Sequence, residues 1–116
     1  MANSFNVTIA EAALWSLQDA ESFKSNYTDS VQAALWADDL LASSIKAISQ
    51  DPDRYRYNAM LADKGISIRE RLDPDNQYRC LYDFDEQNGV IEILLLLALS
   101  KILRKCFTDI LLLNRC

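Results

Sequence analysis

Residues 78–98 carry the pattern of a β-hairpin whose second strand lies inside a sheet. The first strand alternates between two faces, and Asn88-Gly89 tolerates the positive φ values of a tight hairpin turn. One face carries Tyr78, Cys80, Tyr82 and Phe84, and the other carries Arg79, Leu81 and Asp83. The run from Val90 to Leu97 is almost entirely apolar, which is typical of a central strand. The hairpin therefore predicts a central strand that is covered on both faces.

Two further strands are predicted before this hairpin. Residues 5–9 place Phe5, Val7 and Ile9 on one side, which is the two-residue period of a half-buried strand. Residues 66–72 have the same period, with Ile66, Ile68, Glu70 and Leu72 on one face and Ser67, Arg69 and Arg71 on the other. The segment 73–76, Asp-Pro-Asp-Asn, should turn the chain from this strand into the hairpin.

Two helices are expected between the first two strands. The first begins at Glu11 and fades near residues 25–28, and the second ends before Pro52, which disfavours helical geometry at Asp51. The candidates for the N-cap of the second helix are Thr28, Asp29 and Ser30. Because the connection is short, the helices should form an antiparallel hairpin.

Each helix shows a stripe of apolar residues that is expected to face the core. The first stripe contains Leu14, Leu17 and Ala20, widened by Ala13 and by Trp15 or Phe23. The second contains Val31, Ala34, Leu35, Asp38, Leu41, Ala42, Ile45 and Ile48, and it is apolar apart from Asp38. Trp15 and Trp36 are interpreted as packing residues, and Cys80 as a buried, unreactive thiol.

The order of these elements predicts an α+β fold. An N-terminal strand and an antiparallel helical hairpin should pack on a twisted, mainly antiparallel sheet of about four strands. A C-terminal helix over about residues 99–113 should follow, with an apolar stripe that covers an open face of the sheet or pairs with a second copy. The 116 residues suit one domain, with its core over about 5–98.

Composition excludes several classes of function. The net charge of −5 gives no long-range attraction to nucleic acid, and a chain without histidine lacks the commonest general base and metal ligand. Three cysteines without metal-binding spacing favour free thiols in a reducing cytoplasm. The longest apolar run is too short to cross a membrane, and the N-terminal residues lack the pattern of a signal peptide. We expect a soluble, cytoplasmic protein without a metal or cofactor.

Arginines on the predicted strands are the candidate binding residues. Arg69, Arg71 and Arg79 are expected to project from one face of adjacent strands and to form a local positive strip. The alternative is that they lie on a solvated face and balance Glu70, Asp83 or Asp85 across strands. Likewise, Tyr55 and Tyr57, beside Arg54 and Arg56, either stack bases or anchor a loop.

The order strand, helical hairpin, irregular link and three-stranded meander resembles the RelE/ParE superfamily of bacterial type II toxins. The resemblance rests on Tyr78, Arg79 and Tyr82, followed by the branched apolar strand from Val90 to Leu97. Residues 7–23 and 66–72 look like the family's first strand and helix and the strand before its hairpin. The similarity covers about residues 5–98, and it implies a small toxin that a cognate antitoxin peptide neutralises.

The resemblance implies two alternative activities. A RelE-like member would cleave ribosome-bound mRNA without a metal, with Arg79 contacting the phosphate and Arg69 near it. The C-terminal tyrosine of that branch has no counterpart here, because Phe107 lies near its place and cannot transfer a proton. A ParE-like member, which the long helical hairpin favours, would poison DNA gyrase through protein contact. The candidate binding residues are Arg71 of the predicted strip, Tyr78 and Tyr82 of the hairpin, and Lys101 and Arg104 in residues 100–107, which resemble the ribonuclease branch's basic C-terminal segment. A scaffold without toxicity, serving as an adaptor, is the third alternative, and a homodimer through the terminal helix is a further possible assembly.

Overall fold

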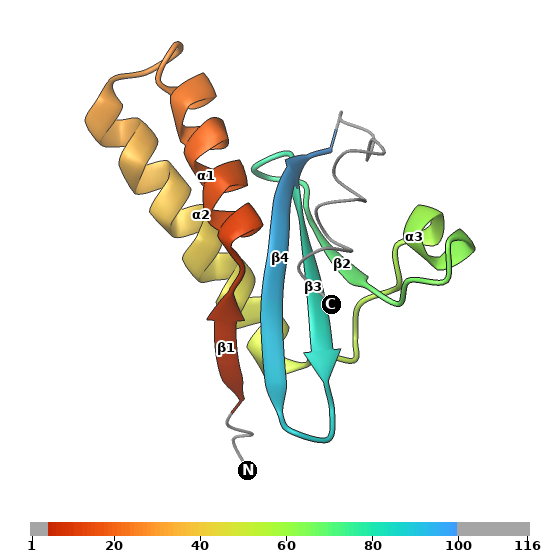
Figure 1. Cartoon of the computed structure of the whole chain (residues 1–116). Helices are drawn as coiled ribbons and strands as arrows, with labels where there is room; N and C mark the ends of the chain where they lie inside the picture. Colours follow the sequence, from red (N-terminus) through yellow and green to blue (C-terminus); the bar gives the residue numbers. More distant parts are fainter. Residues whose placement is uncertain (1–4, 100–116) are drawn as a thin grey trace.

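The computed structural model describes residues 5–99, which form an α+β fold around a four-stranded mixed sheet (Figure 1). The strand order is β1-β4-β3-β2. The strands are β1 (Asn6–Ile9), β2 (Arg69–Asp73), β3 (Tyr78–Asp85) and β4 (Val90–Ala98). β1 pairs with β4 in parallel, while the other two pairs are antiparallel. The predicted fold class is confirmed.

Two long helices form an antiparallel hairpin on one side of the sheet, and a short third helix lies on the far side of β2 (Figure 1). They are α1 (Glu11–Lys24), α2 (Ser30–Gln50) and α3 (Ala59–Asp63). The Asp29 carboxylate accepts a hydrogen bond from the backbone N–H of Gln32 at 2.7 Å, so one of the three cap candidates is the N-cap. The predicted ends of both helices are confirmed, whereas the helix expected over 99–113 falls almost wholly outside the described residues.

β4 is the centre of the molecule. It lies between β1 and β3. A β-bulge near Leu81 and Tyr82 shifts the pairing of β3 with β4, so that Leu95 pairs with Leu81 and Ile93 pairs with Tyr82. Gly89, at φ +65°, completes the turn from β3 into β4. Ile91 and residues 93–97 of β4 are buried, which confirms the prediction of a strand covered on both faces.

The sheet divides the buried apolar residues into two clusters. The cluster on the helix side contains Ala13, Leu40, Ile48, Cys80, Tyr82, Ile91, Ile93 and Leu96. The second cluster contains Ala10, Ala12, Leu61, Ile68, Leu81, Leu94, Leu95 and Leu97. Leu61 belongs to α3, so the short helix contributes to the core of the opposite face.

The predicted core faces of the two helices were partly wrong. α2 buries Ala33, Ala37, Leu40, Ser44 and Ile48, while Val31 and Leu35 are 68% and 64% exposed. On α1 the buried residues are Ala12, Ala13 and Ala20, and Leu14 is exposed. Small side chains at these positions let the helices approach the sheet and each other closely. Other members of the predicted stripes do face the core: Ala13, Ala20 and Ile48 are buried, and Leu17, Leu41 and Ile45 pack against the helix-side cluster.

Close packing through alanine makes these positions sensitive to added volume. Ala37 is 1% exposed, so Ala37→Leu should lower the free energy of unfolding by about 1–3 kcal/mol, because extra methylene groups force neighbouring side chains from their preferred rotamers. Leu35→Ala, two residues away on the exposed side, should change it by less than about 0.5 kcal/mol. Urea denaturation of both variants measures the difference, and equal effects would contradict the observed helix face.

Candidate functional site

The three strand arginines lie on two faces of the sheet. Arg69 pairs with Tyr82 and Arg71 with Cys80, and residues directly opposite one another share a face. Arg79 instead pairs with Leu72, which lies on the opposite face. The prediction of a single positive strip was therefore wrong. The β2–β3 turn pairs Asp73 with Tyr78, and this register decides which face of β2 meets which face of β3.

Arg79 is held in a buried ion-pair network. Its Nη1 lies 3.4 Å from the Glu70 carboxylate, and its Nη2 donates to the carbonyl oxygen of Leu99 at 2.9 Å. The Glu70 side chain, 4% exposed, also accepts hydrogen bonds from Arg56 and from the Asn58 amide at 3.2 and 3.0 Å. This is the charge balance across strands that the sequence offered as the alternative to a binding role.

One donor of Arg79 is not used within residues 5–99. Its Nε is buried and has no hydrogen-bond partner in that part of the chain. The two Nη atoms, in contrast, are engaged with Glu70 and with the Leu99 carbonyl oxygen. The position that the resemblance assigned to phosphate contact is thus occupied by structural interactions.

Arg69 is enclosed by the loop that follows α2. Its Nη1 donates to the carbonyl oxygens of Asp53 and Tyr55, at 3.2 and 2.5 Å, and its guanidinium lies 4.3 Å from the centre of the Tyr57 ring. Beside it is a small polar pocket of about 240 Å³. The pocket is lined by Asp53, Tyr57, Ser67, Arg69, Asp83, Phe84 and Glu86. Three carboxylates facing one arginine make this pocket unfavourable for a phosphate.

Arg71 and the hairpin tyrosines are also engaged inside the fold. Arg71 lies 3.7 Å from the Asp73 carboxylate and 3.4 Å from the Ser44 hydroxyl. Tyr78 packs edge-on against Trp36, and the buried Tyr82 donates its hydroxyl to the Pro52 carbonyl oxygen at 2.6 Å. These contacts fix how α2 and the following loop sit on β2 and β3.

The phenol groups are poor candidates for proton transfer. Burial raises the pKa of Tyr82 well above its ordinary value, and burial together with the negative charge of Asp19 raises the pKa of Tyr78. A general base works best when its pKa lies near the operating pH. Both hydroxyls are therefore protonated at neutral pH, and that of Tyr82 donates its hydrogen bond to Pro52.

The tyrosine-rich loop is anchored to the sheet. Tyr55 packs edge-on against Tyr82, and Arg56 forms an ion pair with Glu70 at 3.1 Å. The interpretation of this segment as a loop anchor is confirmed. Trp36, whose indole N–H donates to Asn76 at 3.0 Å, is confirmed as a packing residue, whereas Trp15 is 55% exposed. Lys101, Arg104 and Phe107 lie outside the described residues.

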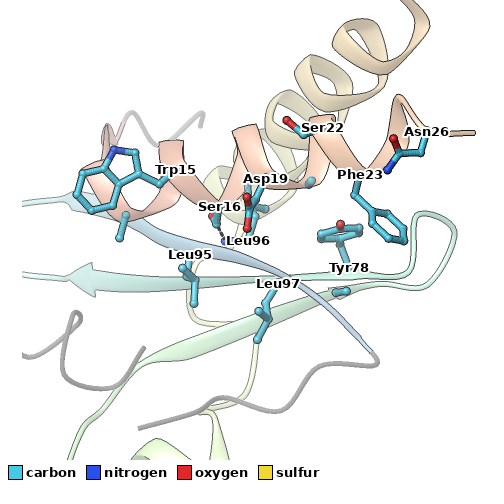
Figure 2. Close-up of a pocket in the computed structure, with 13 residues that line it drawn as sticks. Trp15, Ser16, Asp19, Ser22, Phe23, Asn26, Tyr78, Leu95, Leu96 and Leu97 are labelled. Carbon is cyan, nitrogen blue, oxygen red and sulfur yellow. Dashed lines mark hydrogen bonds between the residues drawn. The ribbon is translucent and has the colours of Figure 1, made fainter. Parts of the chain in front are cut away.

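A groove of about 720 Å³ runs between α1 and the last part of β4, and it was not predicted (Figure 2). We call it the β4 groove. It is lined by Ala12, Trp15, Ser16, Asp19, Ala20, Ser22, Phe23, Asn26, Tyr78, Leu95, Leu96, Leu97 and Ala98. Its leucines are buried, while Trp15 and Phe23, the latter 61% exposed, stand at its rim. A first strand much shorter than the apolar run at 90–98 was the sequence signal that could have revealed it.

No protein-family model matches the chain, and no curated protein matches it either. Among the helices within residues 5–99, none combines the length and apolarity needed to cross a membrane. The same range contains no group of three or more histidine, cysteine or acidic residues arranged to hold a metal ion. The fold and its surfaces thus define an α+β protein with an apolar groove beside its central strand.

Proposed function

We propose that this chain is the toxin component of a type II toxin–antitoxin module and acts, like ParE, by contact with a protein target in the cytoplasm. The element order and the Tyr78-Arg79-Tyr82 hairpin support the family. The target is of the gyrase type, and a cognate antitoxin peptide neutralises the protein. Its action requires no metal or cofactor.

The engagement of the arginines is the observation that carries this proposal. Cleavage of RNA needs positively charged donors that converge on one phosphate and a group that transfers protons near neutral pH. Here Arg69 and Arg79 lie on opposite faces of the sheet, and each is bound to a carboxylate of its own chain. Contact with a protein does not require that convergence. The geometry therefore favours the ParE-like alternative over a RelE-like ribonuclease.

The β4 groove and its rim are the surface best suited to such a contact. Aromatic side chains that are partly exposed beside a buried apolar floor are the usual anchors of protein interfaces. Trp15 and Phe23 have this position, and Asp19 adds a negative charge to the lining. We expect a partner segment with apolar and basic residues to bind here.

Induced expression in bacteria tests the proposal. The wild-type chain is expected to arrest growth, and Trp15→Ser to restore it, because truncating a tryptophan anchor costs about 2 kcal/mol or more of binding free energy. Leu35→Ser, which changes an exposed apolar residue outside the groove, should leave the arrest intact. Colony counts at matched protein levels measure the effect.

Two outcomes would contradict the proposal. Normal growth with folded wild-type protein present would favour an adaptor without toxicity. Equal rescue by Trp15→Ser and Leu35→Ser would show that the groove is not the surface that contacts the target.

Co-expression of the small reading frame adjacent to the gene, if it encodes the antitoxin, is expected to restore growth.

A further inference from the structure

The β4 groove contains a carboxylate without a counter-ion. Asp19 lines the groove and is exposed, and it forms no ion pair within residues 5–99. The nearest basic residue along the chain, Lys24, lies over the Trp36 ring, 5.0 Å from its centre. The buried carboxylates of Glu70 and Asp73, by contrast, lie beside arginines of the same chain. The charge of Asp19 can therefore be matched by a basic group of another molecule.

Two aromatic side chains flank this carboxylate along α1. Trp15, Asp19 and Phe23 follow one another at intervals of four residues, so they form a row along one side of the helix at a spacing of about 6 Å (Figure 2). Trp15 and Phe23 are 55% and 61% exposed, beside the buried leucines of the groove. Aromatic faces attract cations and also cover the apolar stem of a long basic side chain. The row therefore fits a basic side chain placed between two apolar ones.

The β4 side of the groove favours a helical partner over an added strand. The backbone N–H of Leu96 donates to the Ser16 hydroxyl at 3.0 Å, and that hydroxyl donates to the Ala13 carbonyl oxygen at 2.8 Å. Because α1 already engages the backbone of β4 here, a partner gains little from strand pairing. A helix satisfies its own backbone groups and binds through side chains alone. Its residues at i, i+4 and i+8 have the same spacing as the row on α1.

The charge of the helical hairpin favours a basic partner over a second copy of the chain. Residues 11–50 carry six acidic and two basic side chains, a net charge of −4. Two such surfaces repel each other, whereas a basic helix is attracted to one of them. The same charge disfavours an acidic helix with an equally apolar face.

We propose that the β4 groove binds an amphipathic helix that places an arginine against Asp19 and apolar side chains, one turn to either side, against Trp15 and Phe23. Arginine suits this position better than lysine, because its planar guanidinium stacks on aromatic rings and donates two N–H groups to one carboxylate. The biological role of this recognition rests on the proposed function, in which the groove contacts the protein target. The recognition itself depends only on the groove.

Fluorescence anisotropy with the full-length chain tests the proposal. The probe is a labelled peptide of about 15 residues, long enough to form a helix, with leucines one turn before and one turn after a central arginine. A matched peptide carries glutamate at the central position. The arginine peptide is expected to bind at least about tenfold more tightly, because like charges that face each other at an interface are strongly unfavourable. Binding of neither peptide, or equal binding of both, would overturn the proposal.

Charge reversal on the protein locates the contact. Asp19→Lys should reverse the preference, so that the glutamate peptide binds more tightly than the arginine peptide. Asp39→Lys makes the same change at an exposed position of α2 outside the groove lining, and it should leave the order of the two peptides unchanged. Equal effects of the two variants would overturn the proposal, because general attraction to the acidic hairpin would then explain the preference.

The peptide assay uses purified protein and does not measure growth. A preference for arginine in a chain that does not arrest growth would support the recognition and contradict the toxic role. Growth arrest by a chain without that preference would contradict the recognition alone. Failure of the proposed function and failure of this inference are therefore distinguishable.

Discussion

Arg79→Met is expected to lower the free energy of unfolding by about 3 kcal/mol, the lower end of the range for removing one partner of a buried ion pair. The variant leaves the Glu70 carboxylate buried at 4% exposure. Arg56 and Asn58 still donate to Glu70, which is why the higher end of the range is not expected. The bond from Arg79 to the Leu99 carbonyl oxygen is lost as well. Urea denaturation followed by circular dichroism measures the change.

A double-mutant cycle separates the ion pair from the loss of packing. Glu70→Leu combined with Arg79→Met removes both charges, so the double variant should be more stable than the sum of the single changes predicts, by about 0.5–3 kcal/mol. Arg54→Met, which changes an exposed arginine in the same half of the protein, should alter stability by less than about 0.5 kcal/mol. Strict additivity of the two changes would show that Arg79 does not stabilise Glu70.

Cys80 should resist alkylation in the folded protein. Burial raises the pKa of its thiol from 9.0 to about 12, although the positive charge of Arg71 acts in the opposite direction. Because only the thiolate reacts, this shift alone reduces the reactive fraction at pH 8 by about 1000-fold. Iodoacetamide labelling of Cys106→Ser/Cys116→Ser, which leaves Cys80 as the single thiol, should be slower in buffer than in urea by at least that factor.

The same pKa shift predicts how stability depends on pH. The folded chain retains the thiol proton above pH 9, where the unfolded chain begins to release it. The contribution of Cys80 is therefore fully present below pH 9 and is lost as the pH rises toward about 12. Cys80→Ala should reduce the fall in the free energy of unfolding between pH 9 and about pH 12.

In the iodoacetamide experiment, rapid labelling at pH 8 in buffer would contradict the buried position of the Cys80 thiol.

Local patterns predicted the elements but not how they meet. The alternation in residues 78–84 and the Asn88-Gly89 turn determine a hairpin, and Asp29 and Pro52 limit the second helix. The relative register of β2 and β3 depends on the turn between them, where Gln77 takes φ +61°, an unusual value for a residue other than glycine. Nothing in the alternation of either strand reveals that register. The positions of Arg69 and Arg79 on opposite faces followed from it.

The helix faces and the groove show the same limit. Periodicity predicts that α2 has one buried face, but contact with the sheet decides that Ala33 and Ala37, and not Val31 and Leu35, occupy it. The β4 groove arises because a four-residue β1 lies beside a nine-residue β4. That difference in length was visible in the sequence. The parallel pairing that places β1 beside the first half of β4 was not.

The stability of the Arg79 network affects how variants of this residue are interpreted. Loss of growth arrest in Arg79→Met would follow from unfolding as well as from lost chemistry, because the side chain supports Glu70 and Leu99. Arg79→Lys keeps a positive charge beside Glu70 and is the better test of a direct role. Its activity must be compared at matched amounts of folded protein.

Mapping of mRNA 5′ ends in cells arrested by the wild-type chain tests most directly whether the protein acts by contact or by cleavage. Contact with a protein target predicts growth arrest with translated mRNA intact, and the same arrest for Arg79→Lys. Codon-phased cuts within translated mRNA, present with the wild-type chain and absent with equally abundant, folded Arg79→Lys, would contradict the account and establish ribonuclease activity.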